Sequence, residues 1–106
     1  MNGGGGLKNM MRQAQNMQKK IAEVQERIGE EEFEASTGGG VVTVTVNGNQ
    51  EMLDISIDPE VMDPDDVEML EEMVVGATNQ ALEKAAEKMN QEVEDITGGM
   101  NIPGLT

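Results

Sequence analysis

Two stretches in the middle of the chain alternate strictly between aliphatic and other residues. The alternating aliphatic positions are Val42, Val44, Val46, Leu53, Ile55 and Ile57. Successive side chains of a strand point to opposite faces, so each stretch predicts a strand with one apolar face. The dipeptide Asn47-Gly48 lies between them and predicts a hairpin with a type I′ turn, which needs two residues that tolerate positive φ. In this prediction the six aliphatic residues form one continuous apolar face.

A third strand is predicted before this hairpin, over residues 30–37. Phe33 and Ala35 alternate there with glutamates and Ser36, a pattern typical of a half-solvated strand. Three glycines, at 38–40, then turn the chain into the valine-rich strand. The result is an antiparallel meander of three strands. The glutamate-rich strand is expected at an edge, where charge discourages edge-to-edge association.

A helix is predicted before the sheet, over residues 7–28. Its apolar residues recur at spacings of three and four: Leu7, Met10, Met11, Ala14, Met17, Ile21, Val24 and Ile28. Gly29 follows at the position expected for a C-terminal cap, and Arg27 in the last turn suits the helix dipole. This helix therefore carries one apolar stripe along its whole length.

A longer helix is predicted after the sheet, over residues 64–97. Asp63 is expected to cap it and Pro64 to occupy its first position. Its apolar stripe is Val67, Leu70, Val74, Ala77, Ala81, Ala85, Met89, Val93 and Ile96. At 1.5 Å per residue the helix spans roughly 50 Å and overhangs its own sheet. We expect a second copy of the chain to cover the overhanging stripe, with Val74, Ala77 and Ala81 in the interface.

These elements predict an α+β fold with the order α-β-β-β-α and two long flanking helices. The chain has 106 residues, which fits one domain at residues 7–97. Residues 1–6, which are rich in glycine, and the tail at 98–106 are expected to be flexible. No apolar run is long enough to span a membrane, and the N-terminus lacks the apolar core of a signal peptide, so a soluble intracellular protein is expected.

Composition argues against catalysis and against a bound metal or cofactor. The chain has no Cys and no His, and its single aromatic residue is Phe33. Asp58, Asp63 and two further aspartates resemble calcium ligands, but the glycine and the spacing of an EF-hand loop are missing, and helix capping explains them better. The glycine runs are not followed by a Walker lysine. We expect no enzyme, no small-molecule substrate, no metal and no cofactor.

Charge is distributed unevenly along the chain. The formal net charge is −14, yet residues 1–28 hold five basic and two acidic residues, whereas the remainder holds two basic and nineteen acidic ones. At about 100° per residue, Lys8, Arg12 and Lys19 fall within about 40° of one another, opposite the apolar stripe. With Lys20 they form a basic stripe that is able to contact phosphates, although a charged outer face is often only a solvated one. The ten methionines fit a core, a dimer interface or a peptide-binding groove.

Five motifs in this order resemble the YbaB/EbfC family of bacterial nucleoid-associated proteins. They are KNMMRQAQNMQKK at 8–20, STGGGVVTVTVNG at 36–48, IDP at 57–59, DDVEMLEEMVVGATNQALEKA at 65–85 and TGGMNIPGL at 97–105. The resemblance covers residues 7–105. It implies an α-β-β-β-α homodimer shaped like tweezers, in the cytoplasm and on the nucleoid, that binds double-stranded DNA and influences nucleoid organisation or gene expression without catalysis.

In this family DNA contact is attributed to the helices. Mapped onto this chain, the resemblance implies contacts from Lys8, Arg12, Lys19, Lys20, Lys84 and Lys88. The alternative hypothesis is a protein-interaction adaptor whose partner binds the methionine-rich helical surfaces. A strong salt dependence of DNA binding favours the first hypothesis, and salt-insensitive binding of a protein partner favours the second.

Overall fold

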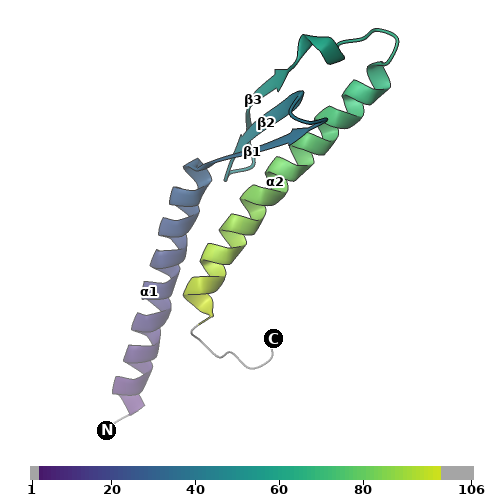
Figure 1. The fold of residues 1–106 in the computed structure, drawn as a ribbon. Helices are drawn as coiled ribbons and strands as arrows, with labels where there is room; N and C mark the ends of the chain where they lie inside the picture. The colour runs from purple at the N-terminus through teal and green to yellow at the C-terminus, as the bar shows by residue number, and fades with distance from the viewer. Residues whose placement is uncertain (1–2, 99–106) are drawn as a thin grey trace.

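The computed structural model describes residues 3–98 and has the predicted order of elements (Figure 1). The elements are α1 (Gly3–Glu30), β1 (Glu32–Thr37), β2 (Val42–Asn47), β3 (Met52–Ile57), the 3₁₀ helix η1 (Pro59–Val61) and α2 (Val67–Thr97). The molecule is elongated, with extents of 78 × 26 × 16 Å and a radius of gyration of 20.8 Å. A compact domain of this length has a radius near 13 Å, so a large part of the two helices lies away from the sheet.

The sheet is the predicted antiparallel meander, with the strand order β1-β2-β3. Val44 pairs with Ala35 on one side and with Ile55 on the other. The register shifts further along, because Thr45 pairs with Asp54 whereas Val46 pairs with Met52. Leu53 is therefore the extra residue of a β-bulge, a feature that strict alternation in the sequence does not reveal.

The core lies between one face of the sheet and α2. Seven fully or almost fully buried residues form it: Ala35, Val42, Val44, Val46, Ala77, Ala81 and Ala85. The prediction that Ala77 and Ala81 lie in a dimer interface is therefore wrong, because these alanines of α2 are buried against the chain's own sheet. A charge at Ala81 would disrupt the folding of each chain and would not test dimerisation.

The part of α2 that extends past the sheet lies beside α1 (Figure 1). The overhang of α2 is thus partly covered by α1 of the same chain.

The predicted continuous apolar face of six aliphatic residues on the sheet is only half buried. The valines of β2 are buried, but Leu53 is 50% exposed and Ile55 is 39% exposed. Ile57 is half-buried and packs against the core, but α2 packs on β1 and β2 and leaves Leu53 and Ile55 of β3 uncovered.

The turn between β2 and β3 is not a type I′ turn at Asn47-Gly48. A four-residue loop at 48–51 joins the strands, and Gln50, with φ 64°, is the residue with positive φ in it. The Oδ1 atom of Asn47 accepts a hydrogen bond of 3.0 Å from the backbone N–H of Glu51. The three glycines of the other turn have φ of 64°, 75° and 101°, so that turn has the conformation for which glycine is needed.

Glycine is required at position 48 by a close approach to the end of α1. The N–H of Gly48 donates to the carbonyl of Glu31 at 3.0 Å, and the N–H of Asn49 donates to the carbonyl of Gly29 at 3.2 Å. A Cβ atom on Gly48 would overlap the carbonyl oxygen of Ile28 and lie 2.5 Å from its carbonyl carbon. These hydrogen bonds from the β2–β3 loop therefore connect the C-terminal end of α1 to the sheet.

The ends of both helices differ from the prediction. The structure places 3–6, predicted to be flexible, in the first turn of α1, and residues 1–2 lie outside the described part. Gly29 is inside α1 and not at its C-terminal cap; a Cβ there would lie 2.5 Å from Oδ1 of Asn49. In α2 the cap residue is Asp66, whereas Asp63 accepts from the N–H of Asp65 at 2.9 Å in the preceding turn. Of the predicted tail only residue 98 is described.

We expect Gly48→Ala to lower the free energy of unfolding by about 1–3 kcal/mol, because the added methyl group forces the hairpin loop away from Ile28. Gly6→Ala is the matched control, since no atom lies within 4 Å of its Cβ position and alanine favours the helix. Urea denaturation measures both variants. Equal midpoints for Gly48→Ala and the parent would contradict the close approach.

Candidate nucleic-acid interface

The N-terminal half of α1 extends beyond the end of α2 (Figure 1). Burial along its apolar stripe changes accordingly. Ile28 is buried and Ile21 and Val24 are half-buried, whereas Leu7 is 60% exposed and Met10 is 67% exposed. The backbone hydrogen bonds from the β2–β3 loop and the packing against α2 thus keep the C-terminal half of α1 in place. We call residues 3–20, which precede this contact, the free half of α1.

Four of the six predicted DNA contacts lie on this free half. Lys8, Arg12, Lys19 and Lys20 are all exposed, and within residues 3–98 they take part in no ion pair. In an α-helix, the first three lie within about 40° of one another and opposite the apolar stripe. Residues 3–22 contain these four cations and no acidic residue, so positive charge is not neutralised along this stretch.

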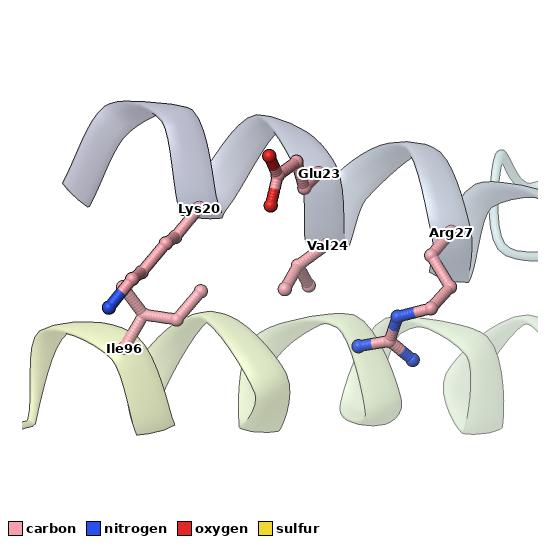
Figure 2. A pocket seen from close by; sticks show the side chains of 5 residues that line it. All are labelled: Lys20, Glu23, Val24, Arg27 and Ile96. Atoms are coloured by element: carbon pink, nitrogen blue, oxygen red, sulfur yellow. The ribbon is translucent and has the colours of Figure 1, made fainter. Parts of the chain in front are cut away.

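Lys20 is the last residue of the free half. It adjoins the rest of the chain, residues 21–98, which we call the body. It lines an open groove between the helices together with Glu23, Val24, Arg27 and Ile96. Figure 2 shows the side chains of Lys20 and Arg27 reaching from α1 toward α2, with Val24 between them and Ile96 of α2 at the Lys20 end. The groove is thus lined by two apolar side chains, two cations and one carboxylate, and the opposite charges partly offset one another.

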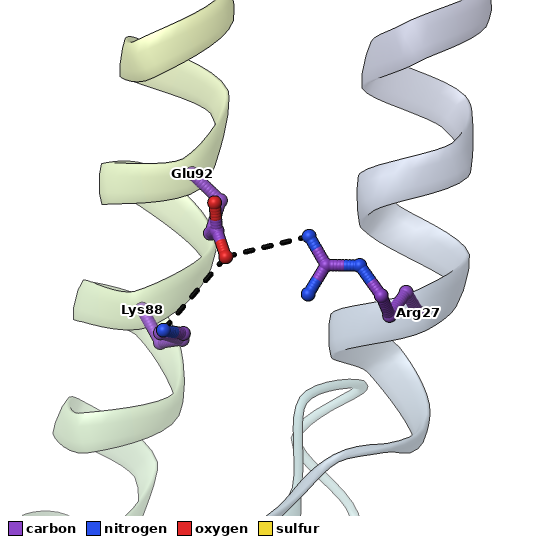
Figure 3. Close-up of polar contacts among 3 residues, drawn as sticks. All are labelled: Arg27, Lys88 and Glu92. Atoms are coloured by element: carbon purple, nitrogen blue, oxygen red, sulfur yellow. Dashed lines mark hydrogen bonds and ion pairs between the residues drawn. The ribbon is translucent and has the colours of Figure 1, made fainter.

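Lys88 is on α2 and shares its partner with Arg27. The Oε1 atom of Glu92 lies 3.3 Å from a guanidinium nitrogen of Arg27 and 3.7 Å from Nζ of Lys88 (Figure 3). Glu92 therefore bridges α1 and α2. Sequence analysis missed this link, since Arg27 and Glu92 are 65 residues apart and no local pattern connects them.

Lys84 is also engaged within the chain. Its Nζ atom donates a hydrogen bond of 2.7 Å to the backbone carbonyl oxygen of Glu34. This carbonyl belongs to β1, which is an edge strand of the sheet. Lys84 thus satisfies an acceptor at the edge and ties α2 to it. The structure brings Lys8, Arg12, Lys19 and Lys20 together on one helix, and it separates Lys84 and Lys88 from them.

Residues 3–98 contain no group of three or more acidic side chains placed to hold a metal ion. Within the same range, no helix is long and apolar enough to cross a lipid bilayer. The cation-rich free half of α1 is therefore the feature on which we base the functional proposal.

Comparison with known proteins decides the family. The model of the YbaB/EbfC DNA-binding family matches residues 3–100. The chain belongs to this family. The predicted resemblance is confirmed, and the matched range includes both helices and the whole sheet.

Curated relatives agree with this assignment. A nucleoid-associated protein from Clostridium novyi (strain NT) is 50% identical over 99% of this chain and 92% of the relative. Another, from Clostridium acetobutylicum, is 50% identical over 97% of this chain and 92% of its own length. A third, from Alkaliphilus metalliredigens, is 49% identical over 99% and 92%.

A solved structure has the same fold. The uncharacterized protein HP0035 from Helicobacter pylori superposes with a TM-score of 0.63, over 74% of this chain and 90% of that chain. Its sequence identity is 24%, so this similarity concerns the fold alone.

The bridge at Glu92 should contribute little to stability, because both of its cations are partly exposed and water screens the pairs. A double-mutant cycle on Arg27→Gln and Glu92→Gln should give a coupling of about 1 kcal/mol or less in chemical denaturation. Lys88→Gln serves as the comparison, because it removes the longer of the two contacts. A coupling of several kcal/mol would show that the bridge, and not apolar packing, holds α1 on α2.

Proposed function

We propose that the protein binds double-stranded DNA as a homodimer, through phosphate contacts from the free half of α1, and so influences nucleoid organisation or gene expression in the cytoplasm. Lys8, Arg12, Lys19 and Lys20 supply these contacts. The observation that carries the proposal is the stretch at 3–22, which has four exposed cations and no acid and which projects from the body. Membership of a DNA-binding family supports it. No chemical step is part of the function.

The energy of this contact comes mainly from the release of counterions. Each lysine or arginine that neutralises a phosphate frees a condensed cation from the duplex, and this term does not depend on the base sequence. The rest of the chain opposes binding, because residues 23–106 hold all 21 acidic residues and three basic ones. The duplex is therefore expected to contact the free half and to be repelled by the body. Moderate affinity and strong sensitivity to salt follow.

Lys84 and Lys88 make smaller contributions in this proposal. Lys84 would have to give up its hydrogen bond to Glu34, and Lys88 shares a carboxylate with Arg27. A phosphate must displace these partners before it gains the contact. The four cations of the free half have no such competitor among residues 3–98.

The exposed apolar side of β3 supports the homodimer. Leu53 and Ile55 are large aliphatic residues on the free edge strand, and α2 does not cover them. An uncovered apolar patch at a sheet edge favours association with a second copy. Two copies joined at this edge present two free halves to one duplex, which raises the number of phosphate contacts.

Lys19→Gln should flatten the dependence of binding on salt. If about six phosphates are neutralised by the dimer, log K falls against log salt with a slope near −5. Losing one contact in each subunit should reduce the slope by about two units and weaken binding to all sequences alike. Fluorescence anisotropy with a labelled duplex at several salt concentrations measures both effects.

Lys84→Gln is the matched control, since it also removes one positive charge from a helix. Its slope should stay close to that of the parent, because Lys84 is engaged with Glu34. Equal slopes for Lys19→Gln and the parent would mean that the free half is only a solvated surface. In that case the adaptor hypothesis, with a partner on the methionine-rich helices, replaces DNA binding.

Ile55→Lys should produce a folded monomer, because it places a charge in the proposed contact but outside the buried core. Ser56→Lys is the control, since its side chain leaves the opposite face of the same strand. Sedimentation velocity gives the oligomeric state of each variant, and circular dichroism confirms that it folds. A dimeric Ile55→Lys protein would place the dimer contact elsewhere.

A further inference from the structure

The apolar stripe of α1 has the spacing of a coiled-coil seam. Seven of its positions alternate strictly between steps of three and four: Leu7, Met10, Ala14, Met17, Ile21, Val24 and Ile28. This is the a/d pattern of a heptad repeat, which packs against another helix. Ile28 is buried and Met17, Ile21 and Val24 are half-buried, whereas Leu7, Met10 and Ala14 are exposed.

We propose that this open part of the seam, at residues 7–17, pairs with the same part of α1 in a second copy of the chain, in antiparallel orientation. The seam is continuous with the contact that α1 already makes with α2, so the same packing geometry extends past the point where α2 ends at Thr97. An a/d seam packs against one helix, and the exposed Met11 beside it widens the apolar face that such a helix would cover.

The positions of the charges favour a second copy over a membrane or a duplex as the occupant. A helix that lies on an anionic surface has its cations at the borders of its apolar face. Along the open part of the seam, Lys8, Arg12 and the nearby Lys19 lie on the side opposite the seam; Lys20, which is at the border of the apolar face, comes after the open part and lines the groove with Val24 and Ile96. A polyanion bound to those cations would leave Leu7 and Met10 exposed, so another surface must cover them.

The residues beside the open seam allow self-association. Met11, Gln13 and Gln18 occupy the flanking positions and carry no charge, so two copies meet without like charges in contact. Antiparallel pairing also places the two acidic bodies at opposite ends of the joined helices. Parallel pairing would bring these bodies side by side, where they repel each other.

This contact differs from the one proposed at β3 and does not depend on DNA binding. It leaves the basic stripes of both helices facing outward on opposite sides. If the proposed function is correct, two DNA-binding units are thereby joined through their free halves. The seam is short, so the association should be weak and should increase with protein concentration.

Cross-linking in solution tests the pairing, and the chain suits it because it has no native Cys. Ala14→Cys, in the seam, should give a cross-linked dimer with a short bismaleimide. Asn16→Cys, away from the seam on the same turn, should give much less product. Adding Met10→Glu to Ala14→Cys should reduce its yield to that of Asn16→Cys, since it places two acidic groups in the contact. Met10 is exposed, so folding should be unaffected.

The same cross-linking on an Ile55→Lys background separates this contact from the one at β3. The Ala14→Cys product should persist there even if Ile55→Lys abolishes the other dimer. Equal yields from Ala14→Cys and Asn16→Cys, or a yield that Met10→Glu leaves unchanged, would overturn the pairing. Loss of cosedimentation with phosphatidylglycerol vesicles in Met10→Glu, with cross-linking unchanged, would overturn it in favour of a lipid surface.

Discussion

The close contact between α2 and β2 constrains the rest of the fold. Ala77, Ala81 and Ala85 lie on one side of α2 at intervals of four residues and pack in one cluster with the buried valines of β2. Methyl side chains allow the helix axis to approach the sheet closely, and the aliphatic side chains of β2 fill the space between. Because α2 lies over β1 and β2, Leu53 and Ile55 of β3 stay exposed, and the end of α2 beyond the sheet becomes the surface on which α1 packs.

The cations with partners and the cations without partners lie in different parts of the described chain, as the packed and the unpacked parts of α1 do. Cations in the body are engaged: Lys84 binds a carbonyl of the edge strand, and Arg27 and Lys88 share one carboxylate of Glu92. These contacts help to hold α2 to the sheet and α1 to α2. Lys8 and Arg12 on the free half have no acidic neighbour in sequence up to Glu23. The fold therefore separates the cations that support structure from those that are available to a polyanion.

Most of the fold followed from local patterns, and the differences arise where distant segments meet. Alternation predicted the three strands, and helical spacing predicted both helices. The same spacing could not assign the alanines of α2, because a stripe of small residues fits a dimer interface and a helix–sheet core equally well. Nor could it explain Gly48, whose constraint comes from Ile28, or find the bulge at Leu53. The predicted contacts also fall into two groups. Four of them share the free half, whereas Lys84 is held by Glu34, 50 residues away, and Lys88 shares Glu92 with the distant Arg27.

The central claim is that DNA contacts the free half of α1 and not the acidic body. An NMR titration of the isotope-labelled protein with a short duplex tests it residue by residue. If DNA contacts the free half, the amide shift changes should concentrate between residues 7 and 20 and should fade as salt is raised. Changes concentrated on the polar face of the sheet or on residues 67–76 of α2, with the free half unaffected, would contradict it.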